Sequence, residues 1–268
     1  MNRILFEKGE ITDGIATFGG ERAEHVLNVL HGEVGQVLRT GEIDGKIGTG
    51  EIIECSNVRM FESGNDGQVI KVRCRHQEES LRPWVDLILA PPRPRVMKRL
   101  LPQLAAMGVG RIFLVGAKKV EKDFWGATLL KEENYRPLLI DGLMQAGTSI
   151  LPTLETRRNF RKFVKEEVDG IWPAARRIVA HPYGENCEIA GLSDCRIGVQ
   201  EPIDQTIRQS HNQKILLAVG PEGGWTDDEV ALLEEHGFSR YSLGARILRT
   251  DTATIALLAQ LMKEFGQC

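Results

Sequence analysis

The sequence has few cysteines, and they are not spaced as a metal site or a disulfide framework would require. Five cysteines occur in 268 residues, and none belongs to a Cys-x-x-Cys pair. An even count or such a pair is the usual mark of these structures. Cys187 and Cys195 lie close in sequence, but no matching histidine or cysteine pair accompanies them. We therefore expect reduced thiols and no bound metal.

Long apolar runs are also missing. No run reaches the roughly 20 residues that a membrane-spanning helix needs, and residues 1–20 lack the basic and then apolar order of a secretory leader. We therefore expect a cytoplasmic protein without membrane contact. Hydrophobic residues make up 42% of the chain, enough for ordinary cores, and a length of 268 residues favours two domains.

Neither charge is in large excess. The formal net charge of -3 argues against indiscriminate binding to polyanions. The basic residues are nevertheless bunched, and local patches can contact phosphates whatever the total charge. One run lies near the expected domain boundary: Lys71, Arg73, Arg75, His76 and Arg82. A second run follows the next expected strand: Arg93, Arg95, Lys98 and Arg99. Each run taken alone is better explained as a solvated surface.

The chain has no Gly-x-Gly-x-x-Gly after an early strand, which argues against a Rossmann-type enzyme of small nucleotides. It has instead a glycine turn at residues 220–225 after the apolar run 215–219, which is typical of a strand buried on both faces. Thr226 and Glu229 then have the spacing of a helix capping box. The pattern predicts a strand, a glycine turn and a helix. Taken alone, the turn is also consistent with a simple strand-to-helix connection that binds no ligand.

A second glycine turn follows a second short strand, 239–243. Thr250 or Asp251 can cap the apolar helix that follows, and Arg249 lies just before that cap. A guanidinium beside a helix N-terminus can hold an anion, although a surface ion pair is the simpler reading. Two such turns at the ends of buried strands predict a ligand site.

The two turns together resemble the ribosomal RNA small subunit methyltransferase E (RsmE) family. The matching blocks are Val219-Gly220-Pro221-Glu222-Gly223-Gly224 and Leu243-Gly244-x-Arg246-Ile247-Leu248-Arg249-Thr250-Asp251-Thr252-Ala253. His181-Pro182 resembles the family's turn after an earlier strand, and residues 23–30 resemble its first helix. The resemblance implies a SPOUT-class enzyme that takes a methyl group from S-adenosylmethionine to N3 of a uridine in small-subunit ribosomal RNA. It also implies a trefoil knot and a homodimer.

We expect two domains joined by a linker at 76–84. Residues 1–75 read as short strands with one helix at 21–30, and the resemblance implies a PUA-like or OB-like RNA-binding β-barrel. Residues 85–268 alternate strands and helices, which predicts an α/β domain with a mainly parallel sheet. The expected strands are 85–90, 112–115, 178–180, 215–219 and 240–243, and the expected helices 96–107, 135–146, 160–168, 227–236 and 253–265. Physical rules alone favour an unknotted chain, so only the resemblance implies the knot.

Parallel sheets bind ligands at the carboxyl ends of their strands, which is where the three matching loops fall. The resemblance assigns the cofactor to these loops, at Ala180, His181, Pro182, Val219, Gly220, Glu222, Gly223, Gly224, Leu243, Gly244, Ile247, Leu248, Thr250, Thr252 and Ala253. Uracil N3 is protonated at neutral pH, so a group must accept or stabilise the loss of that proton. Arg249 and Glu222 are the candidates, the first through its charge and the second as a base if buried. Glu222 is also a candidate for holding the turn together.

RNA contacts are expected from basic residues of both domains: Arg22, His25, Arg39, Arg93, Arg95 and Lys98. The chain departs from the family on this side. Gln145 stands alone where a Glu-Gln-x-x-Arg element is usual, and Asn28 and His31 replace arginines. Two alternatives therefore stay open, a methyltransferase of another RNA position and a non-catalytic RNA-binding relative.

Overall fold

The computed structural model describes residues 3–59, 66–182 and 214–264. It divides into two compact units, Met1–Leu81 with Ile140–Leu151, and Arg82–Leu139 with Pro152–Cys268. The division falls near the linker expected at 76–84, but it groups 140–151 with the first unit. Hydrogen bonds explain this grouping, because the backbone N–H of Ser149 donates to Ser80 Oγ (2.9 Å) and that of Arg3 donates to the carbonyl of Met144 (2.8 Å).

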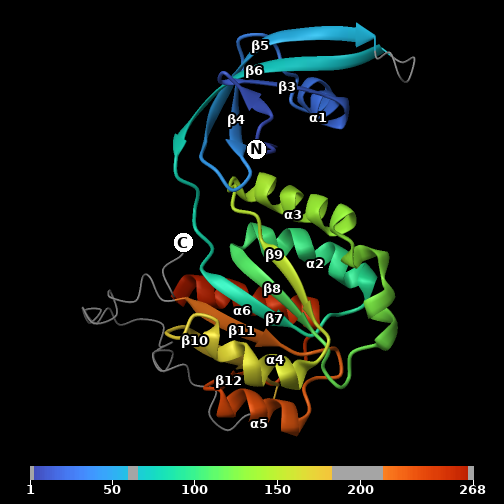
Figure 1. Ribbon diagram of the computed structural model, residues 1–268, viewed down its shortest axis with the longest axis vertical. Coiled ribbons are helices and arrows are strands. Elements are labelled where there is room, and N and C mark those ends of the chain that lie inside the picture. The colour runs from blue at the N-terminus through green and yellow to red at the C-terminus, as the bar shows by residue number, and fades with distance from the viewer. Residues whose placement is uncertain (1–2, 60–65, 183–213, 265–268) are drawn as a thin grey trace, which may run out of the picture. The chain divides into compact units, whose positions relative to one another are not determined.

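The first unit contains a curled, mixed half-barrel sheet with strand order β1-β4-β5-β6-β3-β2 (Figure 1). β1 pairs with β4 in parallel, and the other pairs are antiparallel. The concave side encloses an apolar core in which Phe6 contacts Phe18 at 5.5 Å between ring centroids. The strands are β1 (Ile4–Phe6), β2 (Ile11–Thr12), β3 (Ile15–Gly19), β4 (Val37–Glu42), β5 (Ile47–Arg59) and β6 (Asp66–Glu78). The expected small β domain is confirmed.

The helix expected at 21–30 is present over Gly20–Val29, but its hydrogen-bonding type changes along its length. α1 (Gly20–Glu24) gives way to a π-helical turn, η1 (His25–Val29). Gly32 then passes close to this turn, since a Cβ on Gly32 would lie 2.7 Å from Val26 Cγ1. Ala23 and Val26 are fully buried, so the segment covers the half-barrel core.

The second unit contains a six-stranded, all-parallel sheet with strand order β12-β10-β11-β7-β8-β9. β7 (Val85–Leu89) and β11 (Ile215–Val219) lie at its centre and are buried at every position, as continuous apolar runs predict. The other strands are β8 (Val109–Val115), β9 (Thr153–Arg157), β10 (Arg176–Ala180) and β12 (Ser239–Tyr241). The predicted α/β class is therefore confirmed, and β9 is an additional edge strand.

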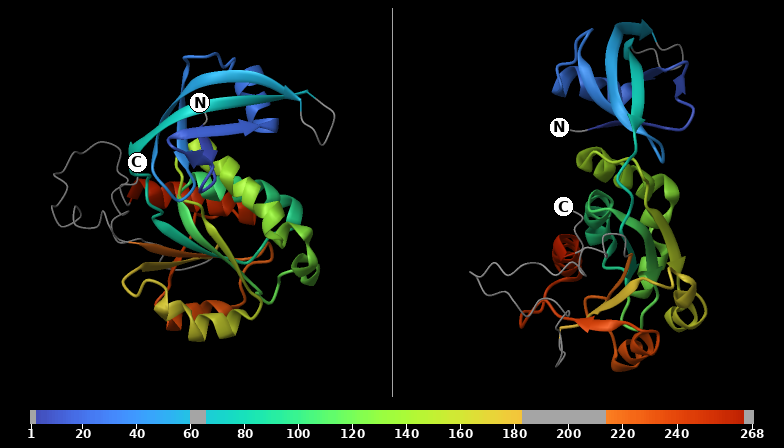
Figure 2. Two further views of the ribbon diagram at one scale, coloured as in Figure 1. Left: turned by 45° about the horizontal axis from the view of Figure 1, so that its top comes forward. Right: turned by 90° about the vertical axis from the view of Figure 1, so that its left-hand side faces the viewer.

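Helices cover both faces of this sheet (Figures 1 and 2). α4 and α5 pack on one face through Phe163 and Leu233, which share a core with Ile88 and Leu216. α2 and α6 lie together on the opposite face. The helices are α2 (Pro94–Ala106), α3 (Glu132–Ala146), α4 (Phe160–Glu166), α5 (Asp227–Glu235) and α6 (Thr250–Glu264), with 3-10 turns η2 (Lys122–Gly126), η3 (Thr128–Leu130) and η4 (Val168–Gly170).

Two expectations fall outside what the structure describes. The trefoil knot stays a prediction, because residues 183–213, between β10 and β11, are not among the described residues. Cys187 and Cys195 belong to the same segment. Within the described ranges, no helix combines the length and the apolar character needed to cross a bilayer.

Candidate functional site

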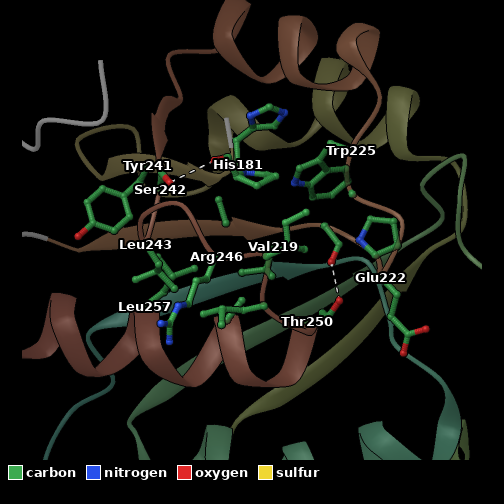
Figure 3. A pocket seen from close by; sticks show the side chains of 18 of the residues that line it. His181, Val219, Glu222, Trp225, Tyr241, Ser242, Leu243, Arg246, Thr250 and Leu257 are labelled. Atoms are coloured by element: carbon green, nitrogen blue, oxygen red, sulfur yellow. Dashed lines mark hydrogen bonds between the residues drawn. The ribbon is translucent and has the colours of Figure 1, made fainter. Parts of the chain in front are cut away.

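A cavity of about 340 Å³ opens at the carboxyl ends of three neighbouring strands, β10, β11 and β12 (Figure 3). Ala180, Val219 and Tyr241 end these strands and line it. The loops that follow the strands supply the rest of the wall, and α6 contributes Ala253 and Leu257. The carboxyl edge of a parallel sheet is the place where such folds bind ligands, and the predicted loops are therefore brought together.

The first glycine turn, 220–225, is tightly folded. Gly224 has φ +71°, a conformation that favours glycine, and its N–H donates to the carbonyl of Pro221 at 2.8 Å. A Cβ on Gly220 would lie 3.1 Å from the Trp225 ring. Glycine is therefore favoured at 224 by its backbone conformation and at 220 by the tight contact with Trp225, and the backbone of the turn borders the cavity directly.

The second turn, 242–249, is held by a serine. Ser242 Oγ accepts a hydrogen bond from the N–H of Gly244 (3.1 Å), and its hydroxyl lies 3.4 Å from the carbonyl of Pro182 (Figure 3). Gly244 has φ +106°. Ile247 is 70% exposed and Leu248 is 38% exposed. Two apolar side chains in the cavity wall are therefore left open to solvent by the described residues.

Thr250 joins the two turns. Its Oγ1 donates to the carbonyl of Gly220 at 3.2 Å, and the backbone carbonyl of Thr250 accepts from Thr254 Oγ1 at 2.7 Å. The third loop is fixed in a similar way, because the N–H of His181 donates to the carbonyl of Tyr241 at 2.9 Å. The cavity walls are thus connected to one another and to the start of α6.

Trp225 carries an unused hydrogen-bond donor at this cavity. The side chain is 5% exposed and its ring stacks on Phe160, with centroids 5.1 Å apart. No group in the described part of the chain accepts from its Nε1. Figure 3 shows the ring nitrogen on the side of the indole that faces the cavity. A buried N–H without a partner is rare and costly, which points to a ligand that accepts from it.

The structure brings the predicted cofactor residues together with one exception. All of them except Thr252 line the cavity. Arg249 does not line it; its side chain is exposed, and its backbone carbonyl accepts from the N–H of Ala253 at 2.8 Å. Six further residues that were not predicted also line the cavity: Pro221, Trp225, Tyr241, Ser242, Arg246 and Leu257. Arg246 could have been found, because it lies in the same turn as Arg249.

Glu222 lines the cavity but is exposed, so the protein alone does not provide the burial expected of a general base. Figure 3 shows its carboxylate turned away from the other labelled residues. Within the described residues, Glu222 makes no hydrogen bond or ion pair. A role in holding the turn together therefore has no contact to support it.

The residues predicted to contact RNA differ in their surroundings. Arg22 is half-buried against Phe18 and forms a 2.6 Å ion pair with Glu10, whose pKa this hydrogen bond lowers. His25 is half-buried in η1. The other four predicted residues are exposed: Arg39, Arg93, Arg95 and Lys98. Among them, Arg93 forms an ion pair with Glu121 at 3.1 Å.

Comparison with known proteins gives consistent matches. A family model described as an RNA methyltransferase domain matches residues 78–262. The ribosomal RNA small subunit methyltransferase E of Treponema pallidum is 27% identical over 98% of this chain and 91% of its own length. The ribosomal RNA small subunit methyltransferase E 1 of Borreliella burgdorferi is 28% identical over 96% of this chain and 95% of its own length.

Solved structures show the same fold. The methyltransferase E of Neisseria gonorrhoeae, bound to S-adenosylmethionine, is similar with a TM-score of 0.67 at 21% identity, covering 98% of this chain and 97% of that one. A methyltransferase structure from Legionella pneumophila, also containing its bound cofactor, has a TM-score of 0.64 at 24% identity and covers 97% and 96%.

Proposed function

This chain belongs to the RNA methyltransferase family as a member of the RsmE type, and we propose that the cavity at the ends of β10, β11 and β12 is its methyl-transfer site. The activity is S-adenosylmethionine-dependent methylation of a uracil in 16S ribosomal RNA. The acceptor atom is N3 of a uridine.

The observation that carries the assignment is the fit between the cavity and the methyl donor. About 340 Å³ lies within the range of roughly 300–1,000 Å³ that small-molecule sites occupy. The donor offers an apolar adenine plane, which suits Ile247 and Leu248. It also offers ribose and carboxylate oxygens, one of which can accept from Trp225 Nε1. The residues present therefore fit this cofactor.

Backbone groups and apolar side chains of this chain would bind different parts of the cofactor. Backbone groups of Gly220, Leu243 and Leu248 read the adenine edge, and the apolar side chains flank the ring. The bound cofactor supplies a methyl group carried on a positively charged sulfur. Because Thr250 fixes the two turns relative to each other, the site is ordered before the RNA arrives, and such preorganisation is the main contribution that a transfer enzyme makes.

The acceptor must lose a proton as the new bond forms. The overall transfer creates an N3–carbon bond, breaks the methyl–sulfur bond and releases the N3 proton. Glu222 and Arg249 are both exposed, so both are placed for the incoming RNA. We assign Arg249 as the positive charge that stabilises the uracil anion. We assign Glu222 as the proton acceptor, with the incoming RNA supplying the burial that makes a carboxylate a stronger base, because the protein alone leaves this side chain exposed.

RNA outside the site would be held by phosphate contacts from both units. The exposed side chains of Arg39, Arg93, Arg95 and Lys98 are available for this, and such contacts fix position and not sequence. As ribosomal RNA is the substrate, the enzyme acts in the cytoplasm. We also propose a homodimer, in which a second copy covers the exposed Ile247 and Leu248.

The test is transfer of tritiated methyl groups from S-adenosylmethionine to small ribosomal subunits that lack the modification. Mass spectrometry of the RNA should place the methyl group on N3 of one uridine. A methyl group on another base would support the alternative that this chain modifies a different RNA position. RNA binding without any calorimetric binding of the cofactor would identify a non-catalytic relative.

A further inference from the structure

Glu229 is a buried carboxylate in the first turn of α5, just after the glycine turn that borders the cofactor cavity. It is 5% exposed and does not line the cavity itself. Its two oxygens contact different parts of the chain. Oε2 accepts from the backbone N–H of Thr226 at 2.9 Å and from Thr226 Oγ1 at 3.1 Å. Oε1 accepts from the backbone N–H of Lys118 at 2.7 Å.

Only the bonds of Oε2 belong to the helix cap. A capping box needs one carboxylate oxygen on the N-cap residue, and Oε2 meets that need alone. The bond from Lys118 is additional, and it joins the start of α5 to the loop after β8, 111 residues earlier. An ionised carboxylate only accepts hydrogen bonds, whereas an amide would turn its NH2 group towards one of these N–H donors. The contacts of Glu229 therefore require an acid.

Lys119 makes a second connection between the same two segments. Its Nζ donates to the carbonyl of Gly223 at 2.7 Å, and a Cβ on Gly223 would lie 3.0 Å from Lys119 Cδ. Gly223 lines the cofactor cavity, whereas Lys119 and Glu229 do not. The loop after β8 thus holds the glycine turn at Gly223 and, through Glu229, at Thr226.

The opposite end of the turn is held by α6, because Thr250 Oγ1 donates to the carbonyl of Gly220 at 3.2 Å. Between these supports lies Trp225, whose Nε1 has no acceptor within the described residues. Trp225 directly precedes Thr226, so a change in the end of the turn would move this donor. A binding loop that is already rigid in its bound conformation gains affinity, because it loses less freedom when the ligand binds.

Resting on the proposed function, we propose that Glu229 is a positioning residue of the methyl-donor site, assisted by Lys119. It fixes the glycine turn on the loop after β8, so that the cofactor meets a turn already in its binding conformation. Losing the bond from Lys118 leaves every cavity-lining side chain in place but lets the turn adopt other conformations. Apparent affinity then falls in proportion to the fraction of molecules that keep the competent conformation.

Glu229→Gln tests this role, with two matched controls. Thr226→Ala removes a hydroxyl from the cap and keeps the bond from Lys118. Asp228→Asn removes the same charge from the same helical turn, at an exposed residue that pairs with Arg161 at 3.3 Å. At a temperature where circular dichroism shows all proteins folded, Glu229→Gln should raise the Kd and the KM for S-adenosylmethionine about tenfold, as if about a tenth of the molecules were competent. Both controls should stay within about twofold of the wild type.

A purely structural role of Glu229 predicts a different result. Partial unfolding removes active molecules, which lowers the apparent kcat and leaves the KM for the cofactor unchanged. That outcome, or a Glu229→Gln variant that binds the cofactor as tightly as the wild type, would overturn the inference and leave the proposed function intact. If the wild type bound no S-adenosylmethionine, the proposed function itself would fail, and the inference with it.

If Glu229→Gln does not fold, Lys119→Met decides. It keeps the alkyl chain of an exposed residue and removes the ammonium group that donates to Gly223. The KM for S-adenosylmethionine should rise about threefold, the loss expected for one hydrogen bond, and Lys119→Arg, which can still donate, should restore it. Lys122→Met, at an exposed residue of the same loop, is the control. A KM of Lys119→Met equal to that of the wild type would contradict the proposal.

Discussion

Thr250 Oγ1 donates a hydrogen bond to the carbonyl of Gly220 across 3.2 Å, and both residues are buried. Thirty residues separate them in sequence. This bond joins the start of α6 to the turn after β11, so the two glycine turns form one wall of one cavity. The arrangement of the site therefore depends on a side chain that also begins a helix.

Replacing Thr250 with valine keeps the shape of the side chain and removes the donor. The carbonyl of Gly220 loses this partner, which should lower the free energy of unfolding by about 1–2 kcal/mol, and affinity for S-adenosylmethionine should fall with it. Thr252→Val is the matched control, because Thr252 is exposed and does not line the cavity. Urea unfolding and calorimetry measure both effects. Equal behaviour of the two variants would show that the bond is unimportant.

Trp225→Phe tests the unused donor. A phenyl ring at position 225 can still stack on Phe160, while the N–H is lost, so cofactor affinity should fall about tenfold, or ~1.4 kcal/mol. Because the substitution also removes the five-membered ring of a buried indole, stability should fall by about 1–2 kcal/mol. Trp84→Phe is the control, because it removes the same buried ring and also the hydrogen bond from Trp84 Nε1 to the carbonyl of Met107 (2.8 Å). It should lower stability by about 1 kcal/mol more than Trp225→Phe does and leave affinity unchanged.

The contrast between the two tryptophans is the informative result. Calorimetry reports affinity and thermal unfolding reports stability, on the same samples. If Trp225→Phe bound the cofactor as tightly as the wild type, the buried N–H would have no ligand and the proposed orientation of the cofactor would be wrong.

The strands and the capping box were predictable because the signals are local. β7 and β11 are continuous apolar runs, and the carboxylate of Glu229 accepts from the N–H of Thr226 at 2.9 Å as its spacing indicates. The same carboxylate accepts from the N–H of Lys118 at 2.7 Å, a partner 111 residues away. No sequence pattern specifies such a contact, because only the parallel order of the sheet brings the two loops together.

β9 was missed for a related reason. Its sequence, Thr153 to Arg157, has only one aliphatic residue, and the strand lies at the edge of the sheet next to β8. Edge strands need no buried run on both faces. A smaller cavity of about 180 Å³, lined by the loops after β7 and β8 and by the turn after β11, could not be predicted from the sequence either, since these loops are adjacent only in the folded chain.

Arg246 and Arg249 have different roles in our account. Arg246 lines the cavity and Arg249 is exposed outside it. Arg246→Ala should therefore weaken cofactor binding about tenfold, the loss expected for a charged contact. Arg249→Ala should bind the cofactor within about twofold of the wild type, yet lose methyl transfer at about 100-fold or more, as when one charge-stabilising group is removed. Full activity of Arg249→Ala would remove this residue from the mechanism.

The stability of the half-barrel should depend on pH through His76. Burial lowers the pKa of this imidazole below its ordinary value of 6.5; nearby Arg3 acts in the same direction and Glu42 opposes it. The neutral ring lies 2.8 Å from Thr40 Oγ1. Below pH 6.5 the unfolded chain takes up a proton that the folded protein excludes, so stability is present above that pH and is lost as the pH falls towards the folded pKa.

His76→Gln should flatten this dependence. Urea midpoints measured from about pH 7.5 to about pH 5.5 should fall more steeply for the wild type than for the variant. His31→Gln is the control, because His31 is exposed. If the urea midpoint of His76→Gln fell with pH as steeply as that of the wild type, the acid sensitivity would belong to another group.

The most direct test of the central claim is a crystal structure of this protein grown with excess S-adenosylmethionine. Our account predicts density for the cofactor at the carboxyl ends of β10, β11 and β12, with Trp225 Nε1 within hydrogen-bonding distance of one of its oxygens and Ile247 and Leu248 beside the adenine. Density for the cofactor elsewhere on the protein, with this cavity empty, would contradict the claim.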